Sequence, residues 1–181
     1  PAHRARDPHG WQRIAIVYPV YHEDVDRVAA GIAATWESIA TKHPRFPHHF
    51  DNYLLSDSRD PAYRIVEEEA VQRLREALPE GRFFYRWRLS NANAKMGNIS
   101  DFCRRWGGDY DYMLVMDADS VMDGDAVVDL LRMMAGNDRI GILQTNPTPI
   151  LRTSLFGRMQ QFGARLYGSV FSYGLQAMYI G

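Results

Sequence analysis

Two acidic residues that could share a metal ion follow an apolar stretch of the chain. Asp117 and Asp119 are separated by one alanine and come directly after residues 112–116. In an extended chain, residues two apart point to the same side, with Cα atoms about 6–7 Å apart. Two carboxylates on one side suit a hard divalent cation, Mg²⁺ or Mn²⁺, that takes its remaining ligands from phosphate and water. The alternative is a solvated acidic turn, because Asp123 and Asp125 follow closely.

Three further polar side chains could bind an anion or a nucleobase. Lys95 lies where a loop is expected to enter a helix, and a helix N-terminus adds free N–H groups and positive dipole charge. The alternative at that position is a capped surface helix with a solvated lysine. Asp57 could accept hydrogen bonds from a base or cap a turn, and Glu23 could do the same or favour the start of a helix.

The elements that must position these residues alternate between strand and helix. Apolar patterning predicts strands over 13–18, 50–55, 83–87, 112–116 and 140–144, and helices over 24–40, 61–77, 97–106 and 125–134. This alternation predicts an α/β fold in which helices cover both faces of a mostly parallel sheet. Ligands bind such sheets at the carboxyl ends of the strands. We therefore expect residues 21–23, 56–60 and 117–119 to gather at one edge.

Size and composition exclude several other classes of function. The chain has 181 residues, 46% of them hydrophobic and 24% charged, which favours one compact domain over disorder. Its net charge of −1 gives no electrostatic reason to propose a nucleic-acid partner. Cys103 is the single cysteine, so an internal disulfide is excluded, and no Cys/His cluster suggests zinc. No apolar run reaches the roughly 18 residues that a membrane span requires.

The order of the candidate residues resembles that of the family 2 processive glycosyltransferases, which have the GT-A fold. The likeness covers residues 13 to about 181 and rests on the spaced series Pro19-x-Tyr21-His22-Glu23, Asp57, Lys95-x-Gly97-Asn98 and Asp117-x-Asp119. Within that family, the sequence is most similar to the bacterial enzymes that build osmoregulated periplasmic glucans. The longer strings behind this likeness lie at residues 55–61, 97–108, 116–120, 144–145 and 160–168.

The resemblance implies a donor site with two ends. The residues implied at the uridine end are Pro19, Tyr21, Glu23 and Asp57. The residues implied at the diphosphate end are Lys95, Asp117 and Asp119, the last two as metal ligands that assist catalysis. Two positions depart from the family's pattern. Ser58 stands where many relatives have a second acidic residue, and Ala94 stands where a larger, often basic residue is expected.

Taken together, the resemblance implies a glucosyltransferase that moves glucose from UDP-glucose to a growing β-glucan by metal-assisted inverting transfer. Such an enzyme would lie in the bacterial inner membrane, with this domain on the cytoplasmic side and a glucan as acceptor. The family's catalytic base follows a Gly-His-Asn stretch, which does not occur before Gly181. Because the chain begins without methionine and stops within an apolar stretch, we expect it to be a fragment of a longer protein.

These features divide the chain into a leader over 1–12, a nucleotide-sugar-binding core over 13–153 and the start of a helical segment over 154–181. The last segment is either an amphipathic helix at a membrane surface or a helix that closes the core. Three other functions stay open: a sister polysaccharide synthase, a non-catalytic nucleotide-sugar-binding module, and a phosphotransferase with Asp117 as nucleophile. The phosphotransferase is disfavoured because Tyr18-Pro19, rather than an aspartate, ends the first predicted strand.

Overall fold

The computed structural model describes residues 12–137 and 139–145 of the chain. The chain divides into two compact units, residues 1–137 and 138–181. All the described helices and strands belong to the first unit. The predicted leader, apart from its last residue, and the predicted segment 154–181 lie outside the described residues.

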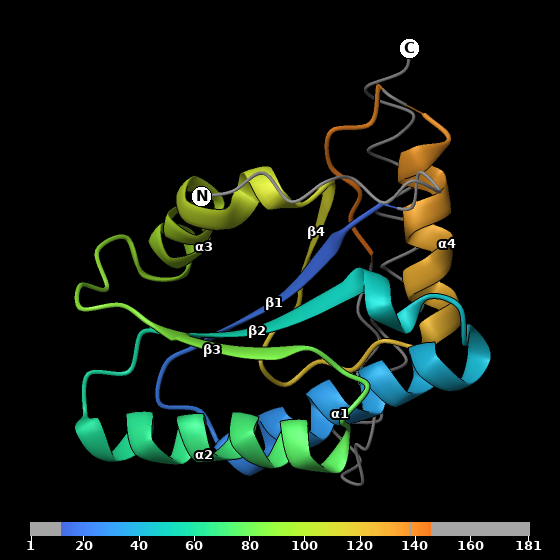
Figure 1. The fold of residues 1–181 in the computed structure, drawn as a ribbon. Coiled ribbons are helices and arrows are strands. Elements are labelled where there is room, and N and C mark those ends of the chain that lie inside the picture. Colours follow the sequence, from blue (N-terminus) through green and yellow to red (C-terminus); the bar gives the residue numbers. More distant parts are fainter. Residues whose placement is uncertain (1–11, 138, 146–181) are drawn as a thin grey trace, which may run out of the picture. The chain divides into compact units, whose positions relative to one another are not determined.

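Four parallel strands form the centre of the first unit (Figure 1). The strands are β1 Ile14–Val20, β2 Phe50–Ser56, β3 Phe83–Trp87 and β4 Tyr112–Val115. Their order across the sheet is β3-β2-β1-β4, and Ile14 of β1 lies opposite both Phe50 of β2 and Tyr112 of β4. This arrangement confirms the parallel sheet predicted from the alternating pattern.

Helices cover both faces of the sheet, as predicted (Figure 1). One face packs against α1 Val25–Lys42, α2 Pro61–Ala77 and α4 Gly124–Ala135, and the other packs against α3 Ala94–Trp106. Two short 3₁₀ helices, η1 Pro47–His49 and η2 Gly107–Asp109, precede β2 and β4. The helices α1, α2 and α4 begin at aspartate N-caps, whose carboxylates accept a backbone N–H of the first turn: Asp24, Asp60 and Asp123.

Successive side chains of β1 point into two different hydrophobic cores. Ile16 belongs to the larger core, together with Trp36 of α1 and Val127 of α4. Val17 faces the opposite side, where Phe102 of α3 belongs to the same cluster. Because both faces of the strand are covered, β1 reads as a continuous apolar run rather than an alternating one.

β1 runs on through Pro19, although the sequence predicts that the strand ends before it. The carbonyl of Val17 accepts a hydrogen bond from Met116 on the β4 side, and that of Val20 accepts one from Asp57 on the β2 side. Backbone groups alternate between the two sides of a strand, so Pro19 faces the β4 side, as Val17 does. The ladder with β4 has already ended at this level, so proline's missing N–H costs no hydrogen bond of the sheet.

One predicted strand and the predicted start of one helix also need correction. The strand predicted over 140–144 is wrong, because the structure gives these residues no strand and Ile142 is 89% exposed. A short apolar run is by itself weak evidence for a strand, since its pattern fits several structures. The helix α3 begins at Ala94 rather than at Gly97, so Lys95 lies in its first turn.

Candidate functional site

The sheet topology brings the candidate residues to one edge. Residues 21–23 follow β1, Asp57 follows β2 and Asp117 follows β4, all at carboxyl ends of parallel strands. The chain moves outward from β1 to β2 and β3, and then places β4 on the other side of β1. Ligands of open parallel sheets bind at such a switch point. The predicted gathering of residues 21–23, 56–60 and 117–119 at the carboxyl edge is therefore observed.

Asp57, the candidate base-binding residue, is buried and paired with an arginine from the neighbouring strand end. Arg88, directly after β3, donates from Nε to Asp57 Oδ1 at 2.5 Å and from an Nη to Oδ2 at 2.7 Å. The hydrogen bond to Asp57 raises the pKa of the Arg88 guanidinium above its ordinary value. A carboxylate has about four lone-pair positions, so this fork leaves capacity on each oxygen for a further donor. Arg88 was not predicted as a site residue.

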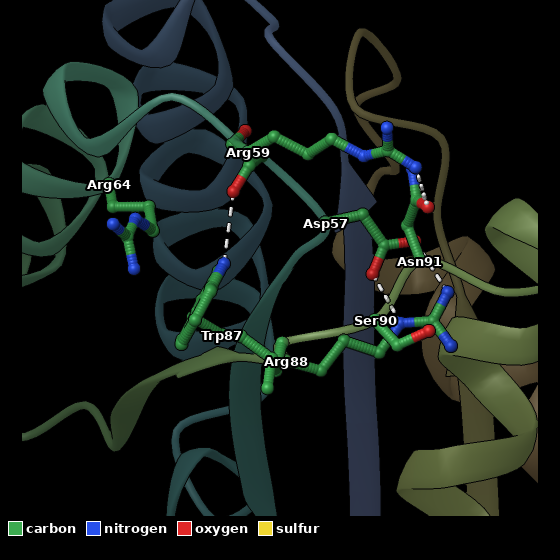
Figure 2. Close-up of a pocket in the computed structure, with 9 residues that line it drawn as sticks. Asp57, Arg59, Arg64, Trp87, Arg88, Ser90 and Asn91 are labelled. Atoms are coloured by element: carbon green, nitrogen blue, oxygen red, sulfur yellow. Dashed lines mark hydrogen bonds and ion pairs between the residues drawn. The ribbon is translucent and has the colours of Figure 1, made fainter.

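A pocket of about 510 Å³ opens beside this pair, between the ends of β2 and β3 (Figure 2). Its walls combine one acid, three arginines, an indole ring, one leucine and small polar residues, namely Asp57, Ser58, Arg59, Arg64, Trp87, Arg88, Leu89, Ser90 and Asn91. The Arg64 guanidinium lies 4.3 Å from the centre of the Trp87 ring, and the indole N–H donates to the Ser58 carbonyl at 2.9 Å. The volume is within the range of small-molecule sites.

Ser58, which departs from the family's acidic pattern, is tied to an acid from α2. Its hydroxyl accepts the backbone N–H of His22 at 3.1 Å and donates to Glu67 at 2.6 Å. The buried Glu67 also accepts from the hydroxyl of Tyr85 at 3.0 Å. Burial raises the pKa of that phenol above its ordinary value, so it stays a donor. The chain after β1 is thereby connected to the chain after β2.

Glu67 was missed because the sequence shows it as part of a charged helix. Its spacing does carry a signal, since it lies three, four and seven residues before Ala70, Val71 and Leu74, which form the buried face of α2. An acid in the apolar stripe of a helix needs a buried partner.

His22 holds the segment that carries two other candidates, Tyr21 and Glu23. Its backbone has a φ of 54°, in the left-handed region, and its Nε2 accepts the backbone N–H of Arg59 at 3.3 Å. The His22 ring stacks between Tyr21 and Tyr63, with centroid distances of 4.3 and 4.5 Å. Tyr21 and Glu23 are exposed, so both are accessible to a ligand at this edge. The remaining candidate of this end, Pro19, is half-buried within β1.

The loop before α3 is tightly folded, and this determines where Lys95 lies. Asn93 and Ala94 have φ values of 59° and 43°, both in the left-handed region that non-glycine residues seldom adopt. A Cβ at Gly97 would stand 1.9 Å from the carbonyl oxygen of Ala92, so only glycine fits there. From the first turn of α3, the Nζ of Lys95 reaches the carboxylate of Asp117 and forms an ion pair with it.

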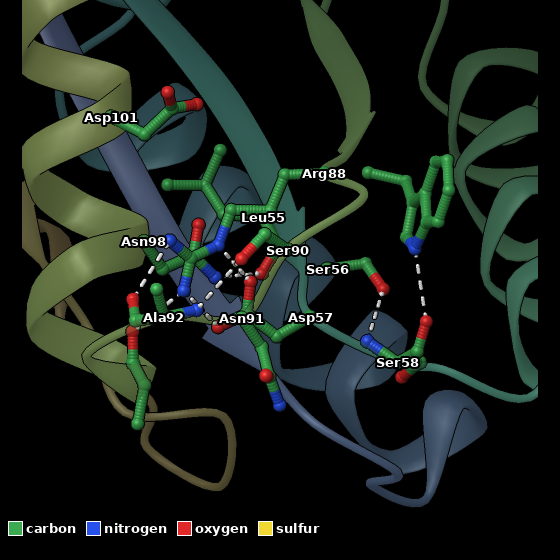
Figure 3. Close-up of polar contacts among 12 residues, drawn as sticks. Leu55, Ser56, Asp57, Ser58, Arg88, Ser90, Asn91, Ala92, Asn98 and Asp101 are labelled. Carbon is green, nitrogen blue, oxygen red and sulfur yellow. Dashed lines mark hydrogen bonds and ion pairs between the residues drawn. The ribbon is translucent and has the colours of Figure 1, made fainter.

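Asn98 anchors the start of α3 to the sheet (Figure 3). Its side-chain amide donates to the carbonyl of Leu55 at 2.9 Å, and its Oδ1 accepts from Arg86 at 2.6 Å. Only 1% of the surface of Asn98 is exposed, so its side chain has a structural role and does not bind a ligand. The Gly97-Asn98 pair therefore has a structural reason that is independent of phosphate binding.

Asp117 and Asp119 lie in a turn, and the extended arrangement assumed from the sequence is wrong. The backbone N–H of Ser120 donates to the carbonyl of Asp117 at 3.0 Å, which closes the turn just after β4. Both aspartates are exposed. Within the described part of the chain, no group of three or more His, Cys, Asp or Glu side chains could hold a metal by itself. Two oxygen donors fit a hard cation that completes its ligands from phosphate and water.

The neighbouring acids Asp123 and Asp125 belong to a separate contact. Lys42, at the end of α1, bridges them at 2.8 and 2.7 Å. Hydrogen bonds from Lys42 lower the pKa of both carboxyls below their ordinary values. These two acids link α1 to the start of α4 and are not part of the turn after β4. Because Asp117 and Asp119 are themselves exposed in that turn, the alternative of a solvated acidic turn stays open at these two positions.

Comparison with known proteins shows the family to which this chain belongs. The family model for glycosyl transferase family 2 matches residues 15–179, nearly the whole chain. The chain belongs to glycosyltransferase family 2, and its parallel sheet with helices on both faces is the Rossmann-like GT-A arrangement.

Curated relatives are similar over almost all of this chain but are much longer. The glucans biosynthesis glucosyltransferase H of Ralstonia nicotianae is 49% identical over 171 residues, covering 93% of this chain and 20% of that protein. The proteins of the same name from Nitrosomonas europaea and Pseudomonas aeruginosa are 45% and 48% identical over 170 residues; each match covers 93% of this chain, and 19% and 20% of those proteins. The chain thus spans about a fifth of the length of these relatives. Among the residues that the structure describes, no helix is long and apolar enough to cross a membrane.

Proposed function

We propose that this chain is the donor-binding part of a glucosyltransferase that moves glucose from UDP-glucose to a growing β-glucan, the backbone of an osmoregulated periplasmic glucan. The enzyme would act at the bacterial inner membrane, with this domain on the cytoplasmic side. The observation that carries the proposal is the pairing of two kinds of site at one sheet edge. A pocket with a buried carboxylate lies at the ends of β2 and β3, and a lysine–aspartate pair lies at the end of β4.

The pocket would take the uridine. Uracil offers an N3–H donor flanked by two carbonyl oxygens. Asp57 can accept the N–H on a lone pair that Arg88 leaves free, and the arginines around the pocket can donate to the oxygens. Tyr21 and Glu23 extend from the adjacent loop toward solvent and would contact the nucleoside at the open side.

The other end would take the diphosphate. Asp117 and Asp119 would hold Mg²⁺ or Mn²⁺, which when bound supplies positive charge to the departing diphosphate. For this to happen, the ion pair between Lys95 and Asp117 must open, and the freed ammonium then faces phosphate oxygens. The first turn of α3 adds backbone N–H groups and positive dipole charge. Inverting transfer also needs a base for the acceptor hydroxyl, which we place outside this chain.

Two other functions would use the same donor groups. A sister synthase would differ in the sugar or in the linkage, and a sensor module would bind the nucleotide sugar without transferring it. The glucosyltransferase is preferred because the relatives reported above carry that name at 45–49% identity. Transfer from UDP-glucose by the whole protein, with chromatography of the product, separates the three.

Base selectivity tests the uridine end. UDP should compete with bound UDP-glucose about tenfold better than CDP does, because cytosine places a lone pair, rather than an N–H, against the carboxylate of Asp57. Asp57→Asn should reduce the preference for UDP over CDP to about twofold, because an amide can either donate or accept a hydrogen bond. Competition calorimetry measures both values, with Asp129→Asn on the outer face of α4 as the matched control. Equal competition by UDP and CDP in the unaltered protein would remove Asp57 from base recognition.

A further inference from the structure

Arg88 makes hydrogen bonds in two directions. Besides its two bonds to Asp57, it donates to the carbonyl of Ala92 at 3.2 Å and to that of Ala94 at 2.9 Å. The side chains of Arg88 and Asp57 are only 10% and 5% exposed. Arg88 therefore joins the residue after β2 to the loop that leads into α3 (Figure 3).

That loop needs an external support. Residues other than glycine seldom adopt the left-handed region, and here the two consecutive residues Asn93 and Ala94 both adopt it. Neither residue is helped by a side-chain cap, since no hydrogen bond from the Asn93 side chain caps α3. The bond from Arg88 to the Ala94 carbonyl fixes the peptide that joins Ala94 to Lys95, and with it the direction in which Lys95 leaves the loop.

The contacts form a continuous path across the edge of the sheet. Asp57 is paired with Arg88, Arg88 with Ala94, and the next residue, Lys95, with Asp117. In the sheet, β2 and β4 are separated by β1. The path through Arg88 thus connects the ends of two strands that are not neighbours.

We propose that Arg88 is a positioning residue that couples base recognition at Asp57 to the placement of Lys95 beside the diphosphate. This inference rests on the function proposed above. A base seated on Asp57 fixes the carboxylate, the carboxylate fixes the guanidinium fork, and the fork fixes the loop before Lys95. Lysine cannot replace arginine in this role, because one ammonium cannot form the planar fork and reach two carbonyls as well.

A double-mutant cycle measures this coupling. Asp57→Asn and Lys95→Met should each weaken UDP binding about tenfold, as expected for loss of one charged hydrogen bond. With Arg88 present, the double variant should lose only about 10- to 30-fold rather than the hundredfold product, because either change already loosens the path. Calorimetry with UDP and Mn²⁺ gives all four affinities, and none of these four proteins alters Arg88.

When the same cycle is measured in an Arg88→Lys background, the loss of UDP affinity in the double variant should equal the product of the two single losses to within about twofold. In an Arg73→Lys background the cycle should keep its coupling, since Arg73 of α2 pairs with Asp26 of α1 and does not belong to the path from Asp57 to Lys95. Two results would overturn the positioning role while leaving the donor site intact. One is a double variant whose loss of UDP affinity equals the product of the two single losses although Arg88 is present. The other is coupling between the two substitutions that persists in the Arg88→Lys background. Failure of the unaltered protein to bind UDP would overturn the donor site and this inference together.

Discussion

Replacing Asp117 or Asp119 by asparagine should remove the metal dependence of UDP binding. Each substitution exchanges an anionic oxygen ligand for a neutral one, and loss of a metal-site group typically weakens affinity about 10- to 100-fold or more. Calorimetry with UDP, with and without Mn²⁺, measures the effect. Asp129→Asn is the matched control, because Asp129 is exposed on α4 and pairs with Arg132 at 2.9 Å.

The ion pair between Lys95 and Asp117 distinguishes a lost metal ligand from a damaged fold. Without metal, Asp117→Asn should bind UDP at least as well as the unaltered protein, because the change releases Lys95 toward phosphate oxygens. A misfolded variant would instead bind UDP poorly under both conditions. Unchanged Mn²⁺-dependent affinity in both aspartate variants would contradict the assignment of the metal site.

Residues 1–181 in isolation should produce no glucan from UDP-glucose. A general base typically contributes about 10²–10⁴ in rate, and positioning of the acceptor can contribute more. Several acids that could act as a base are committed elsewhere: Asp57 to Arg88, Asp101 to Arg105, and Asp123 to Lys42. The chain spans about a fifth of the length of its curated relatives, and we propose that the base and the acceptor-binding groups lie outside residues 1–181.

A radiolabelled UDP-glucose assay, with the product separated by size, compares the isolated segment with the whole protein in membranes. The segment should bind donor and still show less than roughly a hundredth of the rate. A faster rate would place the base within residues 1–181, and Asp101 and Asp123 would then be the first residues to replace.

The elements with explicit local signals were predicted closely. Asp60-Pro61 gives both an N-cap and a proline at the first helical position, and α2 begins at Pro61 and ends at Ala77 as predicted. β3 also has its predicted bounds. The strand over 140–144 failed because an apolar run alone does not supply a neighbouring strand. The predicted start of α3, Gly97, is too late, because Asn93 and Ala94 adopt left-handed backbone angles that their residue types do not indicate.

The candidate site was predicted in position but not in its internal partners. Spacing along the chain places Asp57 and Asp117 at strand ends, because the carboxyl ends of parallel strands share an edge. It does not reveal that Arg88 would reach across from β3 to Asp57, or that Glu67 would reach Ser58 from α2. Those pairs depend on strand register and on the packing of α2 against β3, which are tertiary features.

Photolabelling of the base pocket tests the central claim most directly. A UDP-glucose analogue with an azide on C5 of the uracil ring, irradiated with the protein and Mn²⁺, should attach to the pocket at the ends of β2 and β3. Peptide mass spectrometry should find the label within residues 21–23, 57–59 or 87–91, and excess UDP should prevent it. Labelling that UDP suppresses but that falls only outside these three ranges, or labelling of the pocket that UDP leaves unchanged, would contradict a donor site at this edge of the sheet.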